Sequence, residues 1–293
     1  MTYLNPYKDF GLAGVLRPGA NLGQILYVDT SARGGDDASS GLSVENPKLS
    51  IEGALADCTD AGFDTIVVLN QDNANCPTFP IAVDKDNVTI IAAPSGSYQP
   101  RWEGGAVIDS GEQHCFTMHA LHTRIIGFDL RAGTTSAGVY FGDADCVRPG
   151  IFRCVFTAGQ YGVHASANSM PGTGLEIADC LFASQTTNAI LYNSNGPFFR
   201  FHDNHFHESV GPAINFTGIG GDGGRVMNNT FQLPDDVQGR AITMGFAALG
   251  PVWVSGNQAN FGDVALVANP YEYLSAAAAW GVNYAGIIAV LPA

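Results

Sequence analysis

A repeat in the middle of the chain constrains the fold more than any other feature of the sequence. Segments that share one template are Ile125–Leu130, Ile151–Phe156, Ile177–Phe182, Phe201–Phe206 and Val226–Phe231. One template position is held in turn by Phe128, Cys154, Cys180, Asn204, Asn229 and, more loosely, Asn257, at spacings of 26, 26, 24, 25 and 28 residues. Such a period is typical of solenoids, in which each repeat packs on its neighbours.

A second repeat runs in phase with the first. It comprises Gly138–Phe141, Gly162–Ala165, Ala189–Tyr192, Ala213–Phe216, Ala241–Met244 and Ala265–Val267, at spacings of 24, 27, 24, 28 and 24 residues. Two short apolar strands, with Gly, Asn, Asp and Pro between them, leave no room for a crossover helix in each repeat. The sequence therefore predicts an all-β chain that folds as a parallel β-solenoid.

Stacking would place equivalent residues of successive coils about 4.8 Å apart, so that like side chains form ladders through the core. An apolar column is formed by Leu130, Phe156, Phe182, Phe206 and Phe231. Each buried ring stabilises the fold by about 1.5–3 kcal/mol before entropy is counted. We expect Asn204, Asn229 and Asn257 to form a second ladder whose amides bind backbone groups. Cys154 and Cys180 share that column, but their parallel Cβ directions suit a disulfide poorly.

The two ends of the chain depart from the repeat. We expect an N-terminal arm over residues 1–24, the β-helix over 25–267, and a C-terminal cap or docking segment over 268–293. A capping segment over residues 25–63 would include a helix near Leu49–Cys58. Such a cap is needed because the first coil would otherwise expose an unpaired strand edge and the end of an apolar core.

The capping segment also carries a resemblance to a known superfamily. The residues concerned are Tyr27-Val-Asp29, Gly35-Asp-Asp37, Ser40-Gly-Leu42, Pro47, Ile51, Ala54-Leu55 and Asp64-Thr-Ile-Val67. They resemble the entry segment of pectate-lyase-like right-handed parallel β-helices, of the kind found in phage decoration, head-fibre and tail-spike proteins. The resemblance covers about residues 25–267 in architecture and implies a single-stranded right-handed parallel β-helix with a short N-terminal capping helix.

The same superfamily includes lyases and hydrolases of acidic polysaccharides, but most of their catalytic patterns are missing here. The chain has no H-G or R-x-K element, and Arg148–Arg153 matches the pattern R-x-P-x-x-R only superficially because Pro149 is misplaced. The remaining candidates for catalysis are Asp143, Asp145, Arg148 and His164. Tyr140 and His164 should stack on one outer face, and the group would suit Ca²⁺ or a sugar acid. The alternative is that these are ordinary turn residues.

A second concentration of ionisable residues includes His205 and His207. These histidines alternate with Phe206 of the core, so both should point outward on one face. At this spacing they are candidate metal ligands, shared with a symmetry mate or a neighbouring coil. The alternative is a histidine-rich but unligated surface.

Charge and hydropathy exclude several partners. Thirteen Lys and Arg against 27 Asp and Glu give a formal net charge of −14, which repels nucleic acid and anionic membranes. No apolar run approaches the roughly 20 residues that span a bilayer. The first ten residues show no secretory signal. We therefore expect neither a nucleic-acid nor a membrane partner, and synthesis in the cytoplasm.

These observations leave two principal functions open. The first is a structural virion protein of a bacteriophage, which would anchor to capsid or tail proteins and present its β-helix to a host-surface glycan. By resemblance to such proteins we expect a homotrimer. The second is a polysaccharide lyase or glycoside hydrolase acting on acidic glycans. A third possibility is a non-catalytic glycan-binding module, whose mark would be an exposed aromatic row along one side. Tyr140, Tyr161 and Tyr192 do not form a convincing row of this kind.

Overall fold

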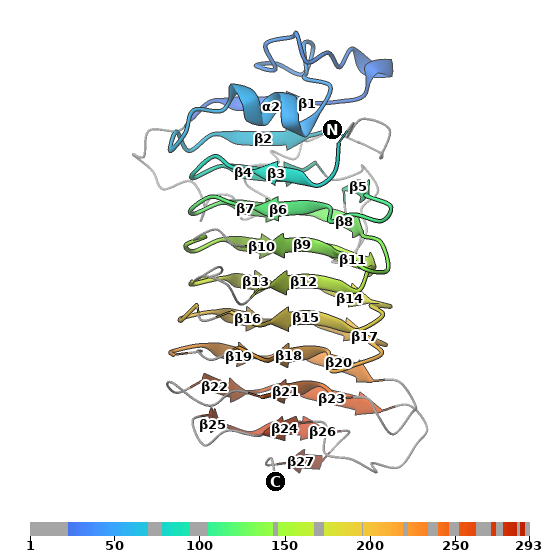
Figure 1. Cartoon of the computed structure of the whole chain (residues 1–293), viewed down its shortest axis with the longest axis vertical. Helices are drawn as coiled ribbons and strands as arrows, with labels where there is room; N and C mark the ends of the chain where they lie inside the picture. Colours follow the sequence, from blue (N-terminus) through green and yellow to red (C-terminus); the bar gives the residue numbers. More distant parts are fainter. Residues whose placement is uncertain are drawn as a thin grey trace, which may run out of the picture.

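The computed structural model describes most of the chain. The described residues are 23–69, 78–93, 105–142, 146–166, 173–194, 196–218, 222–233, 240–245, 252–261, 271–273, 278–285 and 288–290. They form a right-handed parallel β-helix whose coils stack from the N-terminal to the C-terminal end (Figure 1). This confirms the predicted fold class.

Three sheets run along the helix. The ten-stranded sheet contains β1 (Ile25–Val28), β2 (Thr65–Val68), β4 (Thr89–Ala92), β7 (Arg124–Ile126), β10 (Gly150–Phe152), β13 (Glu176–Ala178), β16 (Arg200–His202), β19 (Arg225–Met227), β22 (Val252–Ser255) and β25 (Ala278–Trp280). The eight-stranded sheet contains β3 (Ile81–Val83), β6 (Phe116–Met118), β9 (Ala137–Phe141), β12 (Tyr161–Ala165), β15 (Asn188–Tyr192), β18 (Ile214–Phe216), β21 (Ile242–Met244) and β24 (Tyr271–Tyr273).

The nine-stranded sheet ends in the one antiparallel pairing of the described residues. It contains β5 (Ala106–Asp109), β8 (Phe128–Arg131), β11 (Val155–Ala158), β14 (Leu181–Ala183), β17 (His205–His207), β20 (Thr230–Leu233), β23 (Gln258–Phe261), β26 (Asn283–Ala285) and β27 (Ile288–Val290). Strand β27 pairs antiparallel with β26. Strands β24 to β26 continue the parallel sheets past residue 267, within the segment that the sequence assigns to a C-terminal cap or docking role.

Each regular coil contains three strands, whereas the sequence repeats indicate two. The first template is bent in the middle, so that it supplies one strand to the ten-stranded sheet and one to the nine-stranded sheet. The bend residues have left-handed φ values, of 54° at Arg153, 55° at Asp179, 57° at Asp203 and 57° at Asn228. Because Asp and Asn adopt this conformation more readily than most residues, their presence at this template position favours the bend.

The predicted apolar column is an aromatic ladder. Ring centroids are 4.6 Å apart for Phe156 and Phe182, 4.9 Å for Phe182 and Phe206, and 4.7 Å for Phe206 and Phe231, with interplanar angles of 1°, 8° and 7°. A Cβ atom on Gly162 would lie 2.5 Å from the Phe182 ring. The second repeat therefore opens with a small residue because that residue faces the ladder.

The predicted asparagine ladder is also present and one member longer. The Oδ1 atom of Asn229 accepts hydrogen bonds from the backbone N–H and the Nδ2 of Asn204, both at 3.0 Å. Asn257 does the same for Asn229, and Asn283 does the same for Asn257. Each of these amides is buried. The sequence analysis missed Asn283 because its coil follows residues in which the repeat is no longer visible.

Cysteine occupies this column in the preceding coils. The Cys180 backbone N–H donates to Asn204 Oδ1 at 3.0 Å, and its thiol donates to carbonyl oxygens. Cys154 and Cys180 are both buried and both free thiols. The prediction that stacked cysteines do not pair is confirmed for these two.

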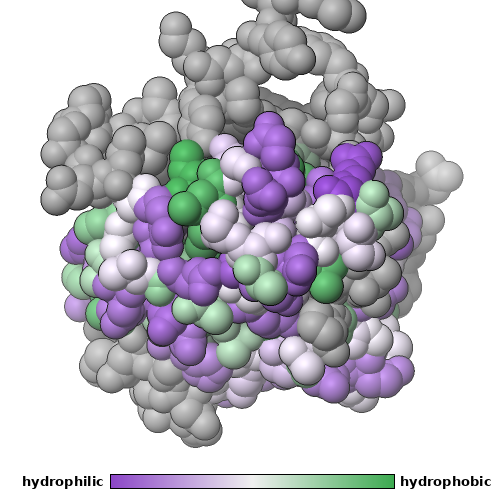
Figure 2. Space-filling model, turned by 90° about the horizontal axis from the view of Figure 1, so that it is seen from above, coloured by the Kyte–Doolittle hydropathy of each residue, from purple (hydrophilic) through white to green (hydrophobic). Residues whose placement is uncertain are grey.

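The N-terminal end of the core is covered by helix α2 (Ile51–Asp57), and the short 3₁₀ helix η2 (Ser31–Arg33) precedes it in the chain. Ser50 caps α2 by accepting from the Gly53 N–H at 2.9 Å, and its hydroxyl donates to Asp37 at 2.8 Å. Buried residues of α2 join the core, while the described surface at this end is largely hydrophilic (Figure 2). The predicted capping helix is confirmed; the predicted arm over residues 1–24 lies almost wholly outside the described residues.

Candidate functional site

The catalytic group expected from the sequence is only partly described. Asp143 and Asp145 lie outside the described residues. Arg148 lies in the turn before β10, where its side chain covers Gly174 of the next coil. His164 lies in β12 of the eight-stranded sheet, and among the described residues no hydrogen bond or ion pair links it to Arg148. A shared catalytic role for these residues stays a prediction, as does Ca²⁺ binding.

His164 instead belongs to an aromatic cluster with His114, Tyr140 and Tyr161 on the outer face of the eight-stranded sheet. The His114 and Tyr140 rings stack with centroids 4.4 Å apart and an angle of 9°. His164 lies 5.2 Å from Tyr140, at 60°, and 4.8 Å from Tyr161, at 48°. The predicted contact between Tyr140 and His164 is confirmed. All four side chains are half-buried.

The aromatic cluster is uncharged at neutral pH. Burial lowers the pKa of His164 to about 4, with a smaller contribution from His114, and burial also lowers the pKa of His114. The Nδ1 atom of His114 accepts a hydrogen bond from the Ala137 N–H at 2.9 Å, so the proton of the neutral ring is on Nε2. The cluster therefore presents two neutral imidazoles and two phenols.

Tyr192, unlike Tyr140 and Tyr161, lies in the core. Its side chain is fully buried and packs against Phe199, Phe201 and Phe216. The three tyrosines therefore do not form an exposed row, because the inward position of β15 falls on Tyr192.

The histidines of β17 point outward on either side of buried Phe206. Burial lowers the pKa of His205, and the nearest acidic contact of His207 is Glu208, whose Oε2 lies 3.7 Å from Nδ1. No group of three or more metal-ligating side chains comes together within the described residues. Metal binding by His205 and His207 stays a prediction.

A different constellation, which the sequence analysis missed, lies on the outer face of the ten-stranded sheet. One outward position of this sheet is held, in register, by Arg124, Gly150, Glu176, Arg200, Arg225 and Trp253. We call its four charged members, Arg124, Glu176, Arg200 and Arg225, the charged row. The side chain of Arg200 is 60% exposed and Trp253 is 52% exposed. A chain of net charge −14 thus concentrates cations along one face.

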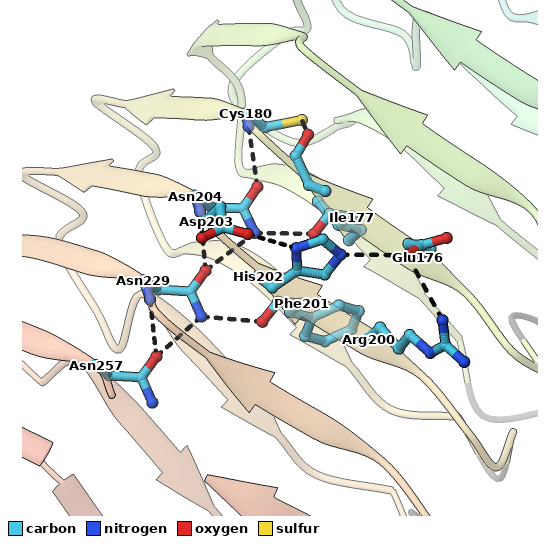
Figure 3. Close-up of polar contacts among 11 residues, drawn as sticks. Glu176, Ile177, Cys180, Arg200, Phe201, His202, Asp203, Asn204, Asn229 and Asn257 are labelled. Atoms are coloured by element: carbon cyan, nitrogen blue, oxygen red, sulfur yellow. Dashed lines mark hydrogen bonds and ion pairs between the residues drawn. The ribbon is translucent and has the colours of Figure 1, made fainter. Parts of the chain in front are cut away.

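Glu176 and Arg200 of the charged row join His202 and Asp203 in one polar network (Figure 3). The Nε2 atom of His202 lies 3.2 Å from Glu176 Oε1, and its Nδ1 lies 2.7 Å from Asp203 Oδ2. Arg200 Nη1 lies 3.9 Å from the same Glu176 oxygen. An imidazole with a carboxylate at each nitrogen donates from both, which requires the protonated ring.

The titration of this network follows from its geometry. The hydrogen bond to Glu176, together with that to Asp203, raises the pKa of His202 to about 9. The hydrogen bond from His202 and the nearby charges of His202, Arg200 and Arg124 lower the pKa of Glu176. At neutral pH the network therefore holds a cationic His202 imidazole beside an ionised Glu176 carboxylate. The available signal in the sequence was the residue before each template segment, which is Arg124, Glu176, Arg200 or Arg225.

Comparisons with known proteins give a fold-level likeness only. No protein-family model matches the sequence, and no curated protein matches it either. The native structure of the GH136 lacto-N-biosidase from Eubacterium ramulus is 12% identical, with a TM-score of 0.37, over 96% of this chain and 69% of that chain. Its selenomethionine derivative is 12% identical, with a TM-score of 0.34, over 90% and 68%. At these values the likeness says nothing about the activity of this chain.

Among the described helices, none has the length and apolar character needed to cross a membrane.

Proposed function

We propose that the protein binds an acidic polysaccharide along the outer face of its ten-stranded sheet. The observation that carries this proposal is the charged row, in which Arg200 and Arg225 occupy adjacent rungs and project from the surface. Arginine pairs with carboxylates in a planar, bidentate geometry, which suits sugar acids. Trp253 follows Arg225 in the same row and offers an exposed apolar ring beside the guanidinium group.

Within the described residues, the network supports binding better than hydrolysis. A glycoside hydrolase needs a carboxylic acid that keeps its proton near neutral pH, commonly in an apolar pocket. The pKa of Glu176 is instead lowered by His202 and by nearby arginines. Glu176 therefore acts as an anchor that orders His202 and Arg200 for an anionic ligand.

Binding can be measured by calorimetry with polygalacturonate and alginate at low and high salt. The proposal requires an acidic polymer to bind and the affinity to fall as salt rises, because surface charges are screened. Salt-independent binding of the acidic polymers, or no binding of either at low salt, would contradict it.

Catalytic breakdown of an acidic polysaccharide would support the alternative function, that of an enzyme. If polygalacturonate or alginate is depolymerised, with or without Ca²⁺, and Asp143→Ala abolishes the reaction, the chain is a polysaccharide lyase or hydrolase. The residues of the charged row would then serve as substrate-binding groups.

A structural role in a phage particle is the second candidate. The observation that favours it is the continuous ladder of hydrogen-bonded asparagines, because a regular ladder of buried, paired amides suits a rod that must persist outside a cell. Electron microscopy of virions labelled with an antibody against the chain tests this role. The expected homotrimer is tested by sedimentation. Labelled capsids or tails would support the virion role, and an acidic glycan on the host surface would then be the ligand of the charged row.

A further inference from the structure

The eight-stranded sheet carries a surface that the proposed function does not use. Its outward row, in register, runs through Thr117, Tyr140, His164, Leu191, Asn215 and Thr243 and then reaches Glu272. From Thr117 to Thr243 the row holds no Asp, Glu, Lys or Arg. The aromatic cluster lies at one end of this row, so an anionic ligand of the charged row would find no cation here.

Stacking determines which part of each ring a ligand can reach. His114 lies parallel to Tyr140 at 4.4 Å and covers one of its faces, and His164 lies on the neighbouring rung. Because stacking covers one face of Tyr140, we expect a ligand to contact the ring edges, which carry the hydroxyl and imidazole hydrogen-bonding groups. Among the described residues, neither the Tyr140 nor the Tyr161 hydroxyl has a hydrogen-bond partner, and the ring nitrogens of His164 also lack one.

Thr117 adds an independent observation. Its side chain is outward but only 8% exposed, and its Oγ1 is buried without a hydrogen-bond partner in the described part of the chain. It is paired in register with Tyr140, so it lies beside the aromatic cluster. A buried hydroxyl without a partner costs about 1–3 kcal/mol, which a ligand that supplies the partner would recover.

We propose that the aromatic cluster and Thr117 form a binding site for an uncharged saccharide, separate from the charged face. A sugar unit carries hydroxyl groups that both donate and accept, which matches phenol, imidazole and threonine groups without any ion pair. Its apolar C–H groups can pack against the parts of the rings that remain exposed. The site therefore selects neutral over acidic sugars because the charge of a sugar acid would lose water and gain no cation.

Calorimetry with maltohexaose, cellohexaose and N-acetylated chitohexaose tests this site. At least one of these neutral probes should bind the wild-type chain. Tyr140→Ala should weaken its binding by about tenfold and Tyr140→Phe by less, since the ring remains. Arg225→Ala should leave neutral binding unchanged, and Tyr140→Ala should leave polygalacturonate binding unchanged. The two proposed binding sites can therefore be confirmed or contradicted independently of each other.

Thr117→Val separates a ligand role from a structural one. If the hydroxyl serves a saccharide, the variant should keep or raise the unfolding temperature of the free protein and weaken neutral binding by about fivefold. Thr243→Val is the matched control, because its Oγ1 is also buried and unpartnered in the described residues but lies several rungs away.

Several results would overturn the proposal. They are the failure of all three neutral probes to bind at millimolar concentration, equal weakening by Thr117→Val and Thr243→Val, and a lower sedimentation coefficient in Tyr140→Ala. The last result would identify the cluster as a contact between copies of this chain.

Discussion

The ten-stranded and the eight-stranded sheets share the same rungs and the same core, yet their outer faces differ in chemistry. The first carries the charged row and a protonated His202. The second carries neutral histidines, tyrosines and threonines. Inward positions are fixed by ladder packing, whereas outward positions are free to change from rung to rung. In such a fold, functional differences should therefore be sought in the outward rows.

The largest expected effect comes from damage to the core beneath both faces. Asn229→Ala removes two donated bonds and leaves buried donors of Asn204 without an acceptor. We expect a loss of about 3 kcal/mol or more in the free energy of unfolding, measured by urea denaturation. Asn260→Ala, on the outer side of β23, is the control and should cost less than about 0.5 kcal/mol. Equal losses would contradict the assignment of the ladder as a core element.

The double variant Arg200→Ala/Arg225→Ala should separate the two faces most clearly. It removes adjacent cations of the charged row, so polygalacturonate affinity should fall by roughly one to two orders of magnitude while neutral-sugar affinity is retained. Calorimetry at low salt measures both. Arg153→Ala, at a bend of the same sheet but outside the row, should change the affinity much less. A parallel loss of neutral binding would remove the distinction between the faces.

Alkaline pH should lower the free energy of unfolding, because His202 on the charged face loses its proton. The pKa of His202 is raised to about 9 in the folded protein, against about 6.5 in the unfolded chain. Protonated His202 therefore contributes fully to the free energy of unfolding below pH 6.5, and this contribution is lost as the pH rises through 9. Because this side chain is partly exposed, we expect about 1 kcal/mol after allowance for solvent screening. Urea denaturation between pH 6 and 10 should show a flatter profile for His202→Gln. Identical profiles would contradict the network.

Acidic pH should lower the free energy of unfolding, because His164 on the uncharged face gains a proton when the chain unfolds. The pKa of His164 is lowered to about 4 by burial and by His114, so the unfolded chain binds a proton more readily. The contribution of neutral His164 to the free energy of unfolding is therefore complete above about pH 6.5 and is lost as the pH falls toward 4. His164→Gln should reduce this acid dependence by about 1 kcal/mol or less. Nuclear magnetic resonance titration of His164 provides a direct check; an ordinary pKa would argue that the ring is solvated.

The smallest effect should come from Cys180→Asn. This variant places an amide where the thiol now contacts the carbonyl oxygens of Ile151 and Ala178, and it extends the asparagine ladder by one rung. We expect a change within about 1 kcal/mol, without any effect on binding at either face. A loss of several kcal/mol would show that the column is packed specifically around sulfur in this coil.

The core could be predicted from the sequence, and the outer faces largely could not. Buried columns repeat the same residue type, as with the phenylalanines and asparagines, because like side chains stack well. Outward positions carry no such constraint, so Glu176 and His202, which are 26 residues apart, give no local pattern. Their contact becomes visible only when the register is known.

Two further differences have physical causes. The third strand of each coil was not predicted because the bend position is held by Arg153, Asp179, Asp203 or Asn228, so no single residue type marks it. The burial of Tyr192 was not predicted, because a tyrosine suits either a surface or a core that accepts its hydroxyl hydrogen bond; here Gly196 O accepts it.

The asparagine ladder gives the rod a polarity. Each side-chain amide oxygen accepts from the preceding coil, so the side-chain amides point the same way from Asn204 to Asn283. Each Nδ2 from Asn204 to Asn257 donates both to the amide oxygen of the following coil and to a carbonyl oxygen of the preceding coil. Removal of the last rung would leave two buried donors of Asn257, its backbone N–H and its Nδ2, without the Asn283 acceptor. Removal of the coil that precedes Asn204 would leave one ladder donor, its Nδ2, without the Ile177 carbonyl oxygen. Shortening the molecule from its two termini should therefore have unequal consequences, and unravelling should be costlier to begin at the end where Asn283 closes the series.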